Sequence, residues 1–286
     1  LTKVAARYEE GLGSIESNES DILLEIPAGF ERTLERGEGG QVMIAANAIN
    51  GTKGGLGTAY LSAIIRDFSS PGNTPSPVAA TYLFNPHLSY KSFMVPGIMV
   101  FLLTLIGGFL SALNIVSEKE KGKIEQINVT PLPKALFLLS KLIPFWIIGF
   151  ILLTISALIA WIVYGLTPVG SLGVIYLFAA IYLIAFTGFG LAISSISSTQ
   201  QQAMFTAFFF LIIFALMGGL FTPVSSMPEW AQRITLFNPM RYMVEVMRMV
   251  YLKGSSLSDL WPQFLIICLF AVGFNALAIT GYRKNR

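Results

Sequence analysis

Five long apolar runs constrain the fold of this chain more than any other feature of its sequence. Each run is long enough, as an α-helix, to cross the roughly 30 Å hydrocarbon layer of a lipid bilayer. Aromatic residues such as Trp161, Tyr164, Trp261 and Tyr282 lie near the ends of these runs, where a bilayer meets water. The runs occupy residues 93–116, 142–164, 172–193, 203–221 and 261–282. They predict a membrane-embedded, all-α helical bundle with five spans in this chain.

Polar residues are concentrated in the N-terminal third. Of the 286 residues, 54% are hydrophobic and 12% are charged, whereas soluble domains carry about 25% charged residues. Residues 69–77 are rich in Pro, Ser and Gly and are typical of a linker. Apolar patterning before that linker predicts strand, helix, strand and helix, at 22–26, 28–36, 41–48 and 58–68. We therefore predict a small α/β domain over 1–92 and a transmembrane domain over 93–286.

A glycine-rich segment at 51–58, GTKGGLGT, looks like a phosphate-binding loop but does not fit that pattern. The Gly-Lys-Ser/Thr that closes a P-loop does not follow the required gap of four residues. We interpret the segment as a turn that leads into a helix. Since no other nucleotide-binding motif occurs, any ATP that drives this protein must be hydrolysed by another chain.

The distribution of basic residues predicts the orientation of the spans. The loop at 117–141 holds five lysines and the C-terminus ends in Arg283, Lys284 and Arg286, whereas the loop at 165–171 has no basic residue. By the positive-inside rule, the lysine loop and the C-terminus are cytoplasmic. Five spans that end inside must begin outside, so residues 1–92 and 222–260 are expected to be extracytoplasmic.

The segment 117–131, SEKEKGKIEQINVTP, separates the first two spans. Six of its first nine residues are charged, and each would cost about 2.5–3.5 kcal/mol or more in hydrocarbon, so the segment must be a loop at a membrane face. Ser117 and Glu120 have the spacing of a capping box, which predicts a short helix in the loop. Gly122 would weaken that helix and allow a bend.

This segment resembles the coupling helix of the type 2 ABC transporter permease family, the membrane subunits of ATP-binding cassette exporters. An ordinary solvated loop is the alternative interpretation. The matching positions are Glu118, Glu120, Gly122, Ile124, Glu125, Gln126, Thr130 and Pro131. The resemblance implies that this loop docks on a separate ATPase subunit.

The same resemblance implies the partners and the setting of the chain. ATP and Mg would be bound by the partner ATPase, with no cofactor in this chain, and a second permease subunit, identical or paralogous, would complete the path. The setting would be the inner membrane of a bacterial cell, where the lipid bilayer surrounds the spans and a periplasmic adaptor is a further partner. The family places a membrane helix before the extracytoplasmic domain, so six spans are expected in the full protein.

A second motif lies between the last two spans. Asn238 and Pro239 form a helix start, with Asn as the N-cap and Pro at the first helical position. The segment that follows, NPMRYMVEVMR, resembles the Asn-Pro-x-Arg-Tyr segment that precedes the last span in the same family. The residues that we assign to an outer gate helix over 238–252 are Asn238, Pro239, Arg241, Tyr242, Glu245 and Arg248. Arg241, Glu245 and Arg248 share one predicted face, so a surface helix with a solvated charged face is an equally acceptable interpretation.

Several kinds of chemistry are absent from the sequence. One histidine, His87, and one cysteine, Cys268, cannot build a Cys/His metal site or a Ser-His-Asp set. The five apolar runs contain no Asp or Glu, which argues against an ion-coupled carrier. The net charge of +3 is too small and dispersed to indicate nucleic acid binding.

We therefore predict the permease subunit of an ABC exporter, a transport subunit with no ATPase site of its own. No residue selects among a drug, a lipid and another amphiphilic substrate. The alternatives are a membrane-anchored sensor or assembly protein that binds a ligand through 1–92, and an intramembrane enzyme.

Overall fold

The computed structural model describes residues 4–17, 19–35, 41–68, 78–122 and 134–284. The chain divides into two compact units, Leu1–Phe93 and Met94–Arg286. The predicted linker at 69–77 lies outside the described residues. Each unit is described by itself.

A three-stranded sheet forms the centre of the first unit. Its middle strand, β2 (Val42–Asn47), pairs antiparallel with β1 (Ile22–Glu25) and parallel with β3 (Val78–Leu83). The helices are α1 (Tyr8–Glu16), α2 (Phe30–Glu35) and α3 (Gly51–Phe68). The sequence analysis predicted β1, α2, β2 and the second half of α3 but missed α1 and β3.

The two longer helices cover opposite faces of this sheet. Gly57 of α3 lies against the side chain of Ile22, and Gly11 of α1 lies against that of Leu23. Because neighbouring side chains of a strand point to opposite faces, α3 and α1 cover different faces of β1. Alanines and Ile44 of β2 are fully buried between them. The sheet therefore holds its own apolar core within the first unit.

The glycine-rich segment is helical, so our interpretation of it as a turn was wrong. α3 begins at Gly51, and the side chain of Asn50 accepts a hydrogen bond from the backbone N–H of Lys53 at 3.0 Å, as a capping residue does. A Cβ atom on Gly54 would lie 3.1 Å from the Cα of Ala48. The glycine at this position thus lets α3 approach the end of β2 closely, which a larger residue would prevent.

The second unit is a helical bundle. Its first span is continuous from Tyr90 to Glu120 and contains α4 (Tyr90–Thr104), the π-helix η1 (Leu105–Leu110) and α5 (Ser111–Glu120). Then follow α7 (Lys134–Tyr164), α8 (Leu172–Ile196), α9 (Gln200–Met217), the 3-10 turn η2 (Val224–Ser226), α10 (Glu229–Thr235), α11 (Pro239–Arg248), the π-helix η3 (Met249–Lys253) and α12 (Trp261–Lys284).

Five helices in the described part of the chain are long and apolar enough to cross a membrane. Their bounds are Tyr90–Glu120, Ser140–Tyr164, Leu172–Ile196, Gln200–Met217 and Trp261–Gly281. These correspond to the five predicted runs, so the prediction of a membrane helical bundle is confirmed. The fourth span ends at Met217 rather than at residue 221, because Gly218 follows it and Gly219 adopts a φ of 79° that ends the helix.

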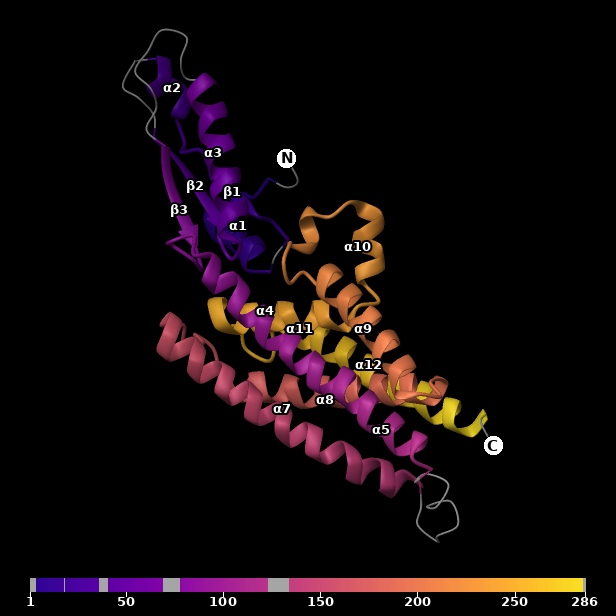
Figure 1. Cartoon of the computed structure of the whole chain (residues 1–286). Helices are drawn as coiled ribbons and strands as arrows, with labels where there is room; N and C mark the ends of the chain where they lie inside the picture. The colour runs from indigo at the N-terminus through magenta and orange to yellow at the C-terminus, as the bar shows by residue number, and fades with distance from the viewer. Residues whose placement is uncertain (1–3, 18, 36–40, 69–77, 123–133, 285–286) are drawn as a thin grey trace. The chain divides into compact units, whose positions relative to one another are not determined.

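Helix α8 has the most neighbours in the bundle. It packs against α5, η1, α7 and α12, and α7 runs alongside the continuous first span (Figure 1). A buried hydrogen bond joins the hydroxyl of Tyr182 on α8 to that of Thr104 in the first span, with 2.6 Å between the oxygens. Since a buried hydroxyl without a partner is costly, this bond favours one rotational setting of α8 against the first span.

Gly190 of α8 marks the closest approach of α8 to the first span. A Cβ atom there would lie 2.7 Å from the backbone oxygen of Gly108 and 3.1 Å from the nitrogen of Ala112. Neither backbone atom can rotate away, so we expect Gly190→Ala to lower the free energy of unfolding by roughly 1–3 kcal/mol. The measurement is the thermal unfolding midpoint of the detergent-solubilised protein.

Gly273 of α12 provides the matched control for this substitution, because a Cβ atom there would meet nothing within 4 Å. Gly273→Ala should leave the midpoint unchanged or raise it slightly, since alanine favours helix. Equal midpoints for Gly190→Ala and Gly273→Ala would show that the packing of α8 on the first span is looser than described.

Candidate functional site

The predicted coupling segment begins inside a helix. Ser117–Glu120 form the last turn of α5, so the prediction that Ser117 caps a new helix was wrong. The helix ends at Glu120, and Gly122 beyond it has a φ of 69° and donates its backbone N–H to the carbonyl of Lys119 at 3.0 Å. A left-handed glycine of this kind is a common helix terminator. Five matching positions lie outside the described residues: Ile124, Glu125, Gln126, Thr130 and Pro131.

Three consecutive charged residues at the end of α5 bind three different helices, and we call them the charged clasp: Glu118, Lys119 and Glu120. Glu118 pairs with Lys141 of α7, with 3.0 Å between Oε1 and Nζ. The Nζ of Lys119 donates to the carbonyl of Ser197 at the end of α8 at 2.8 Å. The Oε2 of Glu120 accepts from the backbone N–H of Gln200 at the start of α9 at 3.3 Å.

The signs of these charges match the helix ends that they contact. Lys119 lies at the C-terminal end of α8, where a positive charge is favoured, and Glu120 lies at the N-terminal end of α9, where a negative charge is favoured. The hydroxyl of Thr199 also caps α9 by accepting from the backbone N–H of Gln202 at 3.2 Å. The charged clasp therefore ties the end of the first span to α7, α8 and α9 together.

The predicted outer gate helix begins where the sequence indicates. The side chain of Asn238 accepts a hydrogen bond from the backbone N–H of Met240 at 3.0 Å, and Pro239 is the first helical residue of α11. The amide of Asn238 also donates to the carbonyl of Phe214 in the last turn of α9 at 2.9 Å. One side chain thus starts α11 and fixes it to the fourth span.

Arg248 lies inside the protein, which contradicts the alternative interpretation of this segment as a surface helix with a solvated charged face. Its side chain is 8% exposed. The guanidinium donates to the carbonyls of Gly219 and Leu220 at 2.9 and 3.1 Å. Because α9 ends at Met217, the carbonyls of Gly219 and Leu220 accept no hydrogen bond from a following helical turn and can bind the guanidinium instead. Arg248 therefore closes the turn that follows the fourth span.

The remaining polar residues of α11 bind neighbouring elements. Nη1 of Arg241 donates to the hydroxyl of Thr235 at 2.6 Å, and the guanidinium lies over the ring of Tyr242, 5.6 Å from its centroid. Tyr242 donates to the carbonyl of Leu236 at 3.0 Å. The interpretation of α11 as a solvated surface helix is therefore wrong, because both of its faces pack within the protein.

Glu245 joins α11 to the last span. It accepts a hydrogen bond from Nε2 of Gln263 on α12 at 3.4 Å. Burial raises the pKa of Glu245 above its usual range, and the positive charge of Arg241 opposes this shift. Together with Asn238 and Arg248, Glu245 holds α11 between the fourth and the fifth spans.

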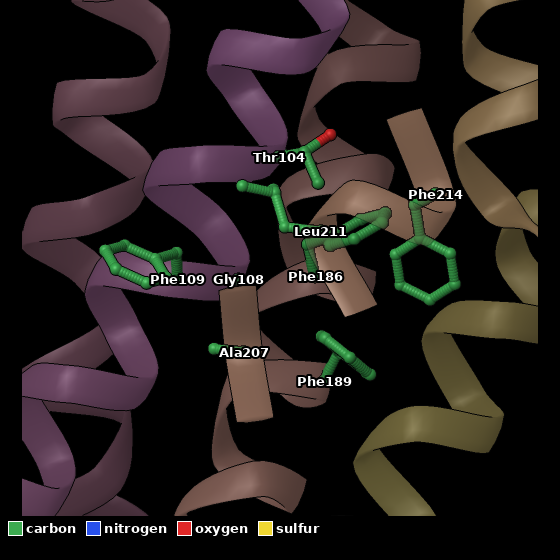
Figure 2. Close-up of a pocket in the computed structure, with 8 residues that line it drawn as sticks. All are labelled: Thr104, Gly108, Phe109, Phe186, Phe189, Ala207, Leu211 and Phe214. Atoms are coloured by element: carbon green, nitrogen blue, oxygen red, sulfur yellow. The ribbon is translucent and has the colours of Figure 1, made fainter. Parts of the chain in front are cut away.

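Aromatic side chains line a narrow groove between the first span, α8 and α9, with no space in it for a water molecule. The rings of Phe186, Phe189 and Phe214 gather on one side, and Phe109 lies on the other (Figure 2). The ring centroids of Phe186 and Phe214 are 5.8 Å apart in an edge-to-face arrangement. The complete lining is Thr104, Gly108, Phe109, Phe186, Phe189, Ala207, Leu211 and Phe214. The sequence analysis did not find this groove, since phenylalanine is common in membrane spans.

Metal-binding geometry is absent from the described residues, which contain no group of three or more His, Cys, Asp or Glu side chains that could hold an ion. The candidate sites in this part of the chain are the charged clasp, α11 and the aromatic groove. Each depends on contacts between spans.

The chain has five candidate membrane spans, and the charged clasp connects the end of the first span to the next three. These features place it among the multi-pass membrane proteins. Residues 1–280 match the ABC-2 family transporter protein family. The chain belongs to this family, whose permease subunits work with an ATPase partner and a second permease subunit.

Individual relatives agree with this assignment. The chain is 30% identical over 278 residues to the probable multidrug ABC transporter permease YbhR of Escherichia coli K12, which covers 95% of this chain and 76% of that protein. It is 25% identical over 287 residues to the probable multidrug ABC transporter permease YbhS, covering 96% and 75%. It is also 25% identical over 279 residues to the inner membrane transport permease YhhJ, covering 92% and 72%. Among the classes that the sequence left open, these relatives support a transmembrane permease subunit.

Proposed function

We propose that this chain exports an amphiphilic substrate from the cytoplasm of a bacterium, using ATP that a separate subunit hydrolyses. The observation that carries the proposal is the charged clasp. It lies at the start of the segment that resembles a coupling helix, and it contacts α7, α8 and α9 at once. A displacement of that segment by the ATPase is thereby delivered to four spans instead of two.

The aromatic groove supports an amphiphilic substrate. Phenylalanine rings offer apolar surface, and their faces attract cationic groups. The groove is closed to a sphere the size of a water molecule, whereas small-molecule pockets typically hold roughly 300–1,000 Å³. A drug-sized or lipid-like substrate would therefore enter this groove only after the first span, α8 and α9 had moved apart.

The orientation follows from the lysine-rich loop and the basic C-terminus. We place the charged clasp and the end of α12 on the cytoplasmic side of the inner membrane, and α11 with the first unit on the outer side. A membrane-impermeant maleimide should then label Glu31→Cys in intact cells and Lys121→Cys in inverted vesicles, both in a Cys268→Ala background. Labelling of Lys121→Cys in intact cells would contradict this orientation.

Transport itself can be measured in inverted vesicles that contain the chain and its ATPase partner. ATP should drive the uptake of ethidium or of a fluorescent phospholipid, the two probes that separate a drug-like from a lipid substrate. Vesicles with a hydrolysis-deficient ATPase are the control. Uptake that is equal with and without hydrolysis would refute the proposal, and uptake of neither probe would refute the amphiphilic substrate class.

A further inference from the structure

The contact between α11 and α12 contains a polar pair whose hydrogen bonds are incomplete. Nε2 of Gln263 donates to Oε1 of Glu245 at 3.4 Å. The other polar atom of the same amide, Oε1 of Gln263, is buried and accepts no hydrogen bond within the described part of the chain. A buried polar atom without a partner is costly, so native proteins contain few of them. The amide oxygen beside this carboxyl therefore needs a donor.

Glu245 itself lies where a negative charge is poorly compensated. It is half-buried, and its hydrogen-bond donor is the uncharged amide of Gln263. The arginines of α11 direct guanidinium nitrogens to other acceptors, since Arg241 donates to the hydroxyl of Thr235 and Arg248 donates to backbone carbonyls beyond α9. An ionised carboxyl in this position has lost part of its hydration and gains only a neutral partner in return.

The ionisable groups around Glu245 leave it as the acid that titrates at this contact. The positive charges of Arg241, Arg248 and Lys253 act to lower its pKa, but burial has the larger effect and raises it. Helix α9, which also packs against α11, has no titratable side chain. The titratable residues of the other elements at α11, and of α11 itself beyond the two arginines, are Tyr176 and Tyr182 of α8, Tyr242 of α11, Tyr251 and Lys253 of η3, and Cys268, Tyr282, Arg283 and Lys284 of α12.

We propose that Glu245 and Gln263 form a proton-binding site, which closes the contact between α11 and α12 when the carboxyl is protonated. A protonated carboxyl has one O–H donor and one acceptor oxygen, the complement of a carboxamide. The O–H of Glu245 then donates to Oε1 of Gln263, while Nε2 of Gln263 donates to the other carboxyl oxygen. The proton comes from the water that reaches the half-buried carboxyl, and the O–H bond is the single covalent bond that forms.

The direction of the pH dependence follows from this arrangement. Because the pKa of Glu245 is raised in the folded protein, the folded state favours the protonated form. The stabilisation by the pair is fully present below the ordinary Glu pKa of about 4.3 and is lost as the pH rises through the raised value. Above that value the amide oxygen of Gln263 has no donor again. Acid therefore fixes α11 to the fifth span more firmly than alkali does.

Infrared spectroscopy of the full chain in detergent can detect the bound proton directly. Spectra are recorded as the pH is lowered from about 8 to about 4, a range that ends near the ordinary Glu pKa of about 4.3. The part of the protonated-carboxyl C=O band that Glu245→Gln removes belongs to Glu245, and its midpoint should lie above about 4.3. Glu229→Gln, which changes an exposed glutamate of α10, is the matched control and should leave this component in place.

A second variant tests whether Gln263 is the partner of the proton-binding carboxyl. In Gln263→Leu the carbonyl of protonated Glu245 no longer accepts a hydrogen bond from Nε2, so its C=O band should move to a higher wavenumber. The unfolding midpoint provides an independent measurement. Relative to Glu245→Gln, whose amide can make the same two hydrogen bonds at every pH, the unchanged chain should lose stability as the pH rises.

Each outcome decides the inference without reference to transport. A midpoint for Glu245 at or below the ordinary value, or a band that stays in place in Gln263→Leu, would overturn the proton-binding site and leave Oε1 of Gln263 to a water molecule. Failure of Glu245→Gln to fold would also overturn it, since a neutral amide should replace the protonated acid. These measurements use the chain without its ATPase or a substrate, so the proposed export activity is judged by the vesicle experiment alone.

Discussion

Arg248→Ala is expected to remove most of the folded protein and all of its transport activity. The substitution leaves the buried carbonyls of Gly219 and Leu220 without the guanidinium that they now bind. Each such carbonyl costs roughly 1–3 kcal/mol when it loses its partner. The unfolding midpoint in detergent should fall by roughly 5–15 °C, since 1 kcal/mol corresponds to about 2–4 °C in a protein of this size.

Two further variants make this result interpretable. Arg248→Lys keeps the positive charge and can still donate a hydrogen bond to one of the two carbonyls. Its unfolding midpoint should therefore lie between those of the unchanged protein and Arg248→Ala. Arg233→Ala removes an exposed arginine from α10 and should leave the midpoint unchanged, since surface substitutions usually change stability by less than about 0.5 kcal/mol. If Arg248→Ala and Arg233→Ala unfolded at the same temperature, the carbonyls of this turn would have other partners.

Charge reversal in the charged clasp is expected to lower ATP-driven uptake about ten-fold without preventing membrane insertion. Glu118→Lys places a positive charge beside Lys141 in a partly shielded pair, where the Glu118 side chain is 16% exposed. A loss of about 1.4 kcal/mol in the coupled step corresponds to a ten-fold lower rate. Insertion should be unaffected, because an added lysine on this loop reinforces the orientation.

Restoration by the second reversal distinguishes coupling from simple damage. Glu118→Lys combined with Lys141→Glu should recover at least part of the uptake, since the pair is rebuilt with exchanged signs. Lys121→Glu, which changes an exposed residue just beyond α5, is the control for a general effect of charge. Uptake in the double variant that is no higher than in Glu118→Lys would show that this ion pair does not link the first span to α7.

The spans could be predicted because their signal is local. A run of about 20 apolar residues has few alternatives to a membrane helix, and the Asn238-Pro239 pair specifies a helix start within two residues. The end of the fourth span was misplaced by four residues, since Leu220 and Phe221 continue the apolar composition after Gly218 and Gly219 have ended the helix. The apolar composition indicated that the run is long enough to span a bilayer. The position of the helix end depends on the left-handed backbone conformation of Gly219.

The contacts of the charged residues could not be predicted, since their partners are distant in sequence. Lys119 binds the carbonyl of Ser197, and Glu120 binds the backbone N–H of Gln200. Neither partner has a side chain that indicates the contact, because both bonds go to the backbone. The burial of Arg248 was missed for a related reason: its position three residues after Glu245 and seven after Arg241 defines a common face but not what covers that face.

The π-helix η1 sets which way the end of the first span faces. A π-helical turn contains about one residue more than an α-helical turn, so everything after Leu110 is rotated by about 100° relative to an uninterrupted helix. In that setting Ala112 and Val116 point into the core, and Glu118 reaches Lys141. Deletion of a single residue from Leu105–Leu110 would restore regular winding and turn this half of the span away from its neighbours. The π-helical turn thus rotates α5 about its axis so that the charged clasp faces α7, α8 and α9, the helices that it contacts.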